Sequence, residues 1–361
     1  MNVKYVVAII AVIVVMIAFT SSTFFLPSEK SKKVVKILCA GSLMIPLKEA
    51  EERFEQQHPN VDVEIEGHGS IQVIRHITEI HEEADVLMVA DCSLIPDMMY
   101  RVKIPGTNES YANWYIRFAR NDVVLAYNQE KSKYADEINS TNWYSVLERA
   151  DVTIGFSNPL LDACGYRALI VCQLAELYYN DSTLFENLIT QNFYPKISAT
   201  KTDDLYIVLI PEVLEPKSEK IILRGGSVQL LALLESGGLD YAFQYRSVAL
   251  QHGLKFLELP SEINLGSAEY ESFYKKVKVR FMLQRFASVG TERTGEPIVY
   301  GITIPENAPH KKLAVEFLKF ILGSDGQEIF SSLHQPIISP AVTDNLDMIP
   351  NTLKTLVKGE D

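Results

Sequence analysis

The residues most suited to chemistry lie in a short turn, 157–165, between an apolar run at 152–156 and a helix predicted from apolar spacing at 166–179. The first backbone N–H groups of a helix have no partners within the helix. They also lie at the positive end of its dipole, so such a turn attracts anions. Asp162 stands where the N-cap is expected. This stretch alone leaves two interpretations open, a helix cap or a ligand-binding carboxylate.

Two earlier stretches repeat this arrangement. The strand predicted at 34–38 leads through Gly41 and Ser42 to a helix at about 45–58. The strand predicted at 61–66 leads through a small-residue turn to Ser70 and a second helix. Three small-residue turns that open helices predict one small anionic ligand, held mainly by N–H and O–H donors.

Catalytic motifs are missing from the sequence. Neither Ser42 nor Ser70 lies in a G-x-S-x-G elbow, and no dinucleotide fingerprint or phosphate-binding P-loop follows a strand. The seven histidines form no i, i+4 pair of the kind that binds zinc on a helix, and we interpret His68 as a polar residue at the rim of a cleft. We therefore expect a protein that is not an enzyme and that carries no cofactor.

Length and charge narrow the class further. A chain of 361 residues with 47% hydrophobic and 22% charged residues is typical of a globular protein with two ordinary domains. Its net charge of −12 argues against a nucleic-acid surface, but it does not exclude a small anion, which responds to local donors.

The N-terminal segment 1–28 has the features of a targeting signal. Lys4 precedes residues 5–28, which carry no charge, and the strongly apolar part at 5–19 is short for a membrane span of about 20 residues. The segment is interpreted as a cleaved signal peptide or an uncleaved anchor. Both place the body of the protein outside the cytoplasm.

Strands alternate with helices, which predicts an α/β fold. We expect the chain to cross between two lobes near 120–122 and to return near 246, with a ligand cleft between the lobes. The predicted units are the leader 1–28, lobe 1 at 34–120 and 247–361, and lobe 2 at 121–246. The irregular segment 181–220 is predicted to be a surface insertion with one strand at 206–210. A disulfide between Cys39 and Cys92 is conceivable, whereas Cys164 and Cys172 are expected to be buried thiols.

Several segments between about 34 and 342 carry a family resemblance. They are Cys39-Ala40-Gly41-Ser42-Leu43, Gly69-Ser70-Ile71, residues 84–91, Ser93-Leu94-Ile95-Pro96, residues 113–119, Ser157-Asn158-Pro159 with Asp162-x-Cys164-Gly165-Tyr166-Arg167, and Leu239-Asp240-Tyr241-Ala242-Phe243-x-Tyr245. Together they resemble the archaeal tungstate/molybdate-binding proteins, which are solute-binding components of ATP-binding-cassette importers. The resemblance implies a two-lobed type II periplasmic-binding-protein fold with a hinged interlobe cleft.

The resemblance also implies a ligand site. It predicts a tetrahedral oxyanion held by the turns at Ser42 and Ser70, by the Asp162 turn and by the phenol of Tyr245. In the family, two carboxylates bond the metal of the oxyanion; Asp162 matches one of them. The position of the second is Ser227 here, so this chain can supply at most one such bond, and a neutral donor takes the other place. Gln244 and Ala163 also depart from the family pattern, which commonly has Glu and Pro there.

The predicted function is therefore an extracytoplasmic receptor, at the cell surface or anchored in the membrane, that captures tungstate or molybdate for an ABC permease and its ATPase. We expect a monomer that binds no nucleic acid. Three alternatives stay open: a receptor for another oxyanion such as sulfate or phosphate, a membrane-tethered oxyanion sensor, and an enzyme built on the same bilobal fold.

Overall fold

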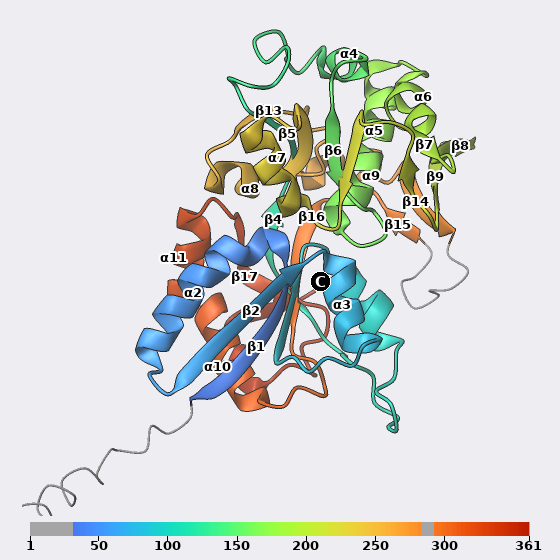
Figure 1. Cartoon of the computed structure of the whole chain (residues 1–361). Helices are drawn as coiled ribbons and strands as arrows, with labels where there is room; N and C mark the ends of the chain where they lie inside the picture. Colours follow the sequence, from blue (N-terminus) through green and yellow to red (C-terminus); the bar gives the residue numbers. More distant parts are fainter. Residues whose placement is uncertain (1–31, 283–291, 361) are drawn as a thin grey trace, which may run out of the picture.

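The computed structural model describes residues 32–282 and 292–360, which form two lobes joined by several chain crossings (Figure 1). The leader predicted at 1–28 lies outside these residues. Within the described ranges, every helix is too short or too polar to cross a membrane. The α/β class expected from the alternation of strands and helices is confirmed.

The first lobe is built on a seven-stranded sheet with the order β18-β17-β4-β16-β3-β1-β2. Its strands are β1 (Lys33–Ala40), β2 (Val61–His68), β3 (Val86–Val89), β4 (Ile116–Asn121), β16 (Ile298–Thr303), β17 (Ile337–Thr343) and β18 (Val357–Gly359). Because β1, β2 and β3 run parallel, their carboxyl ends meet at one edge, beside the second lobe (Figure 1).

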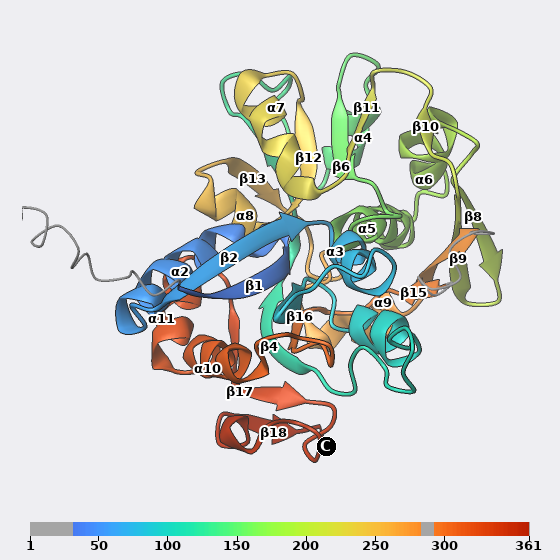
Figure 2. The same cartoon turned by 60° about the horizontal axis from the view of Figure 1, so that its bottom comes forward.

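Four helices cover this sheet: α2 (Met44–Gln57), α3 (Ser70–Thr78), α10 (Lys311–Leu322) and α11 (Ser324–Ser332). Helix α2 packs with α10 and α11, and α3 lies on the other side of β1 and β2, as right-handed crossovers require (Figures 1 and 2). Ile71, Ile74 and Ile77 of α3 are fully buried. Ile80, which continues the same spacing in the sequence, is 67% exposed because the helix ends at Thr78.

The second lobe combines a five-stranded sheet, a four-stranded sheet and a two-stranded pair. Their orders are β11-β6-β12-β5-β13, β15-β14-β9-β8 and β10-β7. The strands are β5 (Val123–Tyr127), β6 (Ile154–Ser157), β7 (Phe193–Tyr194), β8 (Ser198–Thr202), β9 (Leu205–Pro211), β10 (Glu215–Pro216), β11 (Ile221–Arg224), β12 (Tyr241–Tyr245), β13 (Lys255–Glu258), β14 (Val277–Met282) and β15 (Glu292–Thr294).

Helix α5 (Ala163–Tyr179) is the centre of this lobe, because it touches β6 and β12 of the larger sheet and β9 and β14 of the smaller one. Every residue from Ala163 to Ala175 is buried, so its apolar residues surround the whole helix. The lobe's other helices are α4 (Trp143–Glu148), α6 (Leu184–Leu188), α7 (Leu231–Ser236), α8 (Arg246–Gln251) and α9 (Glu271–Tyr274).

Strand pairing differs from two expectations. The strand predicted at 206–210 is present as β9, but it is part of a sheet that packs on α5, so its segment is not only a surface insertion. The return to the first lobe, predicted at 247, comes later, because β13 pairs with β5 and β14 pairs with β9. The chain rejoins the seven-stranded sheet at β16. Apolar patterning identifies a strand but not its partner, so these pairings could not be predicted from the sequence.

The first crossing is a single residue, Asp122, between β4 and β5. Arg246, which follows β12, donates from Nε to both oxygens of Asp122 at 2.9 Å, and its backbone N–H donates to the Asp122 carbonyl at 3.0 Å. Asn121 donates to the hydroxyl of Ser247 at 2.8 Å. These contacts tie the first crossing to the end of β12. We call them the hinge clamp, after the hinge that is expected between the lobes.

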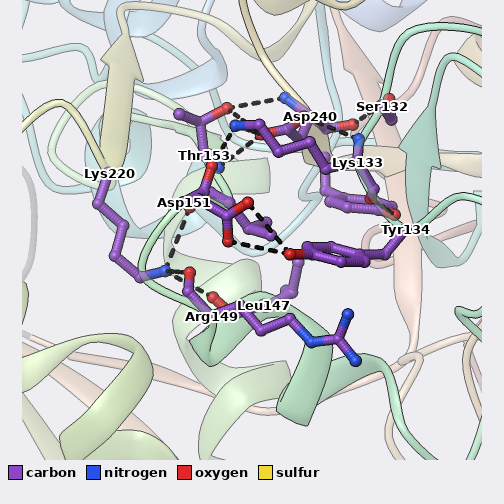
Figure 3. Close-up of polar contacts among 11 residues, drawn as sticks. Ser132, Lys133, Tyr134, Leu147, Arg149, Asp151, Thr153, Lys220 and Asp240 are labelled. Atoms are coloured by element: carbon purple, nitrogen blue, oxygen red, sulfur yellow. Dashed lines mark hydrogen bonds and ion pairs between the residues drawn. The ribbon is translucent and has the colours of Figure 1, made fainter.

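A second polar network stabilises the far side of the second lobe (Figure 3). Asp240 accepts from the backbone N–H of Lys133 at 3.0 Å and from the backbone and hydroxyl of Thr153 at 2.8 and 2.9 Å. Lys220 donates to the carbonyls of Leu147 and Arg149, both at 2.7 Å, and thereby satisfies the end of α4. The network joins β6 and β12 to the loop after β5.

All four cysteines are free thiols, and Cys39, Cys164 and Cys172 are buried. The conceivable bridge between Cys39 and Cys92 is therefore not formed, while the expectation of buried thiols at Cys164 and Cys172 is confirmed.

Candidate functional site

Four turns at the carboxyl ends of parallel strands face one another across the lobes. In the first lobe, β1 leads into the turn η1 (Gly41–Leu43) and β2 leads into α3. In the second, β6 leads into α5 and β11 leads into the turn η4 (Ser227–Leu230). The registers place Ala40 opposite His68 and Arg224 opposite Ser157, so the two turns of each lobe begin side by side.

Asp162 joins turns from both lobes. Its carboxylate accepts the backbone N–H of Ser70, from the first lobe, at 3.4 Å and that of Ser227, from the second, at 3.1 Å. It occupies the predicted N-cap position of α5, yet its side chain makes no capping bond to that helix. Asp162 therefore has the position of an N-cap but not its hydrogen bond. Its carboxylate instead accepts from the first backbone N–H groups of two other helical turns.

Small residues allow this close approach. A Cβ on Gly69 would lie 2.4 Å from the Leu161 carbonyl oxygen and 2.8 Å from the Asp162 Cβ. The backbone N–H of Gln72 donates to the same Leu161 oxygen at 3.1 Å. The first turn of α3 therefore lies directly on the turn that precedes α5, and the lobes are closed on each other at this point.

Ser42 and Tyr245 lie on the other side of this cluster. The hydroxyls of Ser42 and Tyr300 are 3.0 Å apart, and the rings of Tyr300 and Tyr245 face each other edge-on with centroids 6.0 Å apart. Ser70 turns its hydroxyl toward its own lobe, where it accepts the backbone N–H of Ala90 at 3.0 Å. The predicted residues thus gather at one interlobe region, with Asp162, Ser70 and Ser227 in direct contact.

Arg167 is the main contact that sequence reasoning missed. It extends from α5 across the interlobe boundary, and its Nη1 donates to the Ala90 carbonyl and to the Tyr245 hydroxyl, both at 2.7 Å. Its Nη2 pairs with Asp91 at 3.3 Å, and Tyr166 donates to the same carboxylate oxygen at 2.5 Å. The position of Arg167 in the sequence was a usable signal. A charged side chain within an apolar helix is expected to need a buried partner.

Burial controls the electrostatics of the site. Ser42, Ser70, Asp162, Ser227 and Tyr245 are each 5% exposed or less. Burial raises the pKa of Asp162, although the amides of Ser227 and Ser70 and the charge of Arg167 favour its ionised form. Burial also raises the pKa of Tyr245, so its phenol keeps its proton. Because that oxygen already accepts from Arg167, its own hydrogen is available to an acceptor such as an anion.

Gln244, one of the departures from the family pattern, lies against Ser227. Its Nε2 donates to the Ser227 carbonyl at 2.5 Å, while its Oε1 is buried and has no hydrogen-bond partner among the described residues. The position where the family pattern has a carboxylate is thus lined by a serine and a neutral amide.

The sequence of residues 35–332 matches the family described as bacterial extracellular solute-binding protein. The chain belongs to this family. Its relatives include a protein from Staphylothermus marinus named as an uncharacterized solute-binding protein, which is 39% identical over 98% of this chain and 96% of the relative. Another is the molybdate/tungstate-binding protein WtpA of Pyrococcus abyssi, 38% identical over 92% of each chain.

Solved structures of low sequence identity share the fold. The periplasmic molybdate-binding protein of Azotobacter vinelandii superposes with a TM-score of 0.51 at 17% identity, over 83% of this chain and 98% of the other. The sulfate-binding protein SubI of Mycobacterium tuberculosis gives 0.53 at 11% identity, over 84% and 87%. These likenesses confirm the predicted periplasmic-binding-protein fold. Membership of a family of solute-binding proteins confirms the expectation that the chain is not an enzyme.

Proposed function

We propose that this solute-binding protein captures tungstate or molybdate outside the cytoplasm and delivers it to an ABC permease and its ATPase. The observation that carries the proposal is the convergence of backbone amides from both lobes on Asp162. Helix starts that meet at one buried point suit a tetrahedral oxyanion, whose oxygens accept several N–H and O–H donors at once. The naming of WtpA supports this choice of ligand.

In this proposal the hydroxyls of Ser42 and Tyr245 bind oxygens of the anion. The amides of Ser70 and Ser227, which donate to Asp162 in the structure, turn to the anion when it enters. Each hydrogen bond to a charged oxygen contributes on the order of 1.5–3 kcal/mol, so these four donors contribute about 6–12 kcal/mol, comparable to the cost of association of about 4–15 kcal/mol. Opening at the hinge clamp of Asp122 and Arg246 admits the ligand, and closure brings the two sets of donors onto it.

Asp162 decides which anion is bound. A carboxylate beside an oxyanion is repulsive unless it bonds the metal centre, which tungsten and molybdenum allow and sulfur or phosphorus does not. With serine at position 227, only Asp162 can make such a bond. A plain four-coordinate anion such as sulfate is the second candidate, because the neutral Ser227 and Gln244 line the place of a carboxylate.

Calorimetric titration with tungstate, molybdate, sulfate and phosphate tests the proposal. We expect tungstate and molybdate to bind and to raise the melting temperature strongly. Binding of sulfate or phosphate alone would reject the proposed cargo. Asp162→Asn distinguishes binding through an Asp162–metal bond from binding of a plain four-coordinate anion. It should weaken tungstate and molybdate binding but should not weaken sulfate binding.

A second test addresses position 227. In Ser227→Glu, X-ray absorption at the tungsten or molybdenum edge should report one added ligand. An unchanged spectrum would show that our account of this position is wrong.

The remaining parts of the proposal concern the whole protein. We propose that residues 1–28 direct export and either are removed or anchor the chain in the membrane, and that the receptor acts as a monomer. Mass spectrometry of the protein isolated from its membrane fraction would show whether the segment is retained. Light scattering would measure the oligomeric state.

A further inference from the structure

A cluster of imidazoles and carboxylates lies beside the cleft, on the unit formed by β2 and α3. Glu66 and His68 come from β2, His76 from the last turn of α3, and Glu82 from the loop that follows this helix. One ligand atom from each of Glu66, His68 and His76 lies within 4.8 Å of the others. Sequence reasoning excluded a zinc pair on one helix face, but here the two histidines belong to different elements.

The spacing of the cluster's atoms suits a small metal ion. Zinc–ligand bonds of about 2.0–2.1 Å place tetrahedral ligand atoms about 3.3 Å apart. Here His68 Nε2 and Glu66 Oε1 are 2.8 Å apart, His76 Nδ1 and Glu66 Oε1 are 3.9 Å apart, and His76 Nδ1 and Glu82 Oε2 are 2.9 Å apart. Rotation of the side chains would bring the ligand atoms of Glu66, His68 and His76 onto one ion, whereas Glu82 contacts His76 but lies outside this group.

Lys36 orients the two carboxylates. Its ammonium contacts Oε2 of Glu66 at 3.4 Å and also pairs with Oε1 of Glu82. Each carboxylate thus presents one oxygen to Lys36 and the other to a histidine. With neutral imidazoles, two carboxylates against one ammonium leave one net negative charge, which attracts a cation.

His76 provides an independent sign of a missing partner. Its Nδ1 is a buried atom with no hydrogen-bond partner among the described residues, although Glu82 Oε2 lies within ion-pair distance. A buried nitrogen without a hydrogen bond is costly, and a bound metal ion would satisfy it. The side chains of His76 and Glu66 are 17% and 39% exposed, so an ion can enter from solvent.

We propose that Glu66, His68 and His76 form a binding site for a divalent transition-metal ion, with zinc as the best fit to two imidazoles and one carboxylate, and with the fourth coordination position left to solvent. The ion would join the carboxyl end of β2 to the last turn of α3. This unit carries the turn with Ser70, so the ion would stabilise one wall of the interlobe region. The site is separate from the proposed oxyanion donors and does not depend on the identity of that ligand.

The test uses the full-length protein after chelator treatment and removal of the chelator. Co²⁺ serves as the spectroscopic probe and Zn²⁺ as the calorimetric ligand. We expect a visible tetrahedral Co²⁺ spectrum that one equivalent of Zn²⁺ abolishes. His76→Gln and Glu66→Gln should each weaken Zn²⁺ binding at least about tenfold, as expected for the loss of one ligand. His252→Gln, which alters an exposed histidine outside the cluster, should leave binding unchanged.

Lys36→Gln adds a test that a merely structural cluster would not pass. Removing the ammonium removes a repulsive charge from beside the ion, so Zn²⁺ should bind more tightly. Absence of a Co²⁺ spectrum would overturn the proposal and leave the cluster as polar contacts within the protein. Equal binding by wild type, His76→Gln and Glu66→Gln, or weaker binding by Lys36→Gln, would also overturn it.

Discussion

Replacing Arg167 by methionine should destabilise the protein strongly, because it removes a buried cation that joins the lobes. The change deletes the bonds to Ala90 and Tyr245 and the pair with Asp91, whose side chain is 14% exposed. Breaking a buried ion pair by removing one partner costs about 3–5 kcal/mol. With a urea m-value of about 3 kcal/mol/M, this corresponds to a midpoint lower by about 1–2 M.

The pH dependence of this stability loss shows whether the unpaired Asp91 carboxylate causes it. Burial disfavours the ionised form of Asp91, but Arg167 and the Tyr166 hydroxyl bring its pKa below the ordinary value. This carboxylate therefore stabilises the wild type above the unfolded pKa of about 3.9, and that contribution is lost as the pH falls through the folded pKa. In Arg167→Met the carboxylate keeps its burial without its cation, so the deficit relative to wild type should be large at pH 7 and should shrink toward pH 4.

Urea unfolding at pH 7, 5.5 and 4 measures both effects. Arg101→Met is the matched control, because that side chain is 75% exposed and its contact with Asp97 is 3.5 Å long, so its midpoint should stay close to wild type. If Arg167→Met lowered the midpoint by less than about 0.3 M, or if its deficit did not depend on pH, the reasoning about the buried pair would be refuted.

Three further predictions concern the interlobe contact, the second lobe and the hinge. Gly69→Ala forces a Cβ against the Leu161 carbonyl, so the lobes should separate and the radius of gyration from X-ray scattering should rise; Gly225→Ala, whose nearest neighbour would be 3.5 Å away, should not change it. Asp240→Asn should lower the free energy of unfolding by about 1–3 kcal/mol at pH 7, because an amide N–H₂ would face the donors that Asp240 now accepts. Burial alone would raise the pKa of Asp240, but hydrogen bonds from the Lys133 and Thr153 backbones outweigh it and hold this pKa below its usual value. The stability loss in Asp240→Asn should therefore fade below about pH 4, and a loss that did not depend on pH would contradict this prediction. Arg246→Gln should speed hydrogen exchange at the backbone N–H of residue 246, and unchanged protection there would argue against the hinge clamp.

Much of the fold follows from local patterns that the sequence displays. The strand before each turn, the helices α2 and α5, and the N-cap position of Asp162 all appear near their predicted places. Apolar spacing reports which face of an element is buried, and small residues mark where a strand turns into a helix, so both can be read without knowing the partner.

Other features depend on partners far away in the chain. Asp162 bonds to Ser70 and Ser227, which are 92 and 65 residues away, so whether it caps its own helix could not be decided from the turn. Strand β14 was not predicted, although its buried Val277, Val279 and Phe281 alternate with other residues in the pattern of a strand. Its pairing with β9 joins segments that are distant in the chain, and the sheet decides such pairings.

The sequence by itself determined the α/β class, the small-residue turns and the residues that the turns carry. Only the tertiary structure decided that two helical turns from different lobes share one carboxylate, that Arg167 crosses between the lobes, and that His68 meets His76. The physical reason is that burial leaves a local periodicity in the chain. A hydrogen bond or an ion pair between distant residues leaves none.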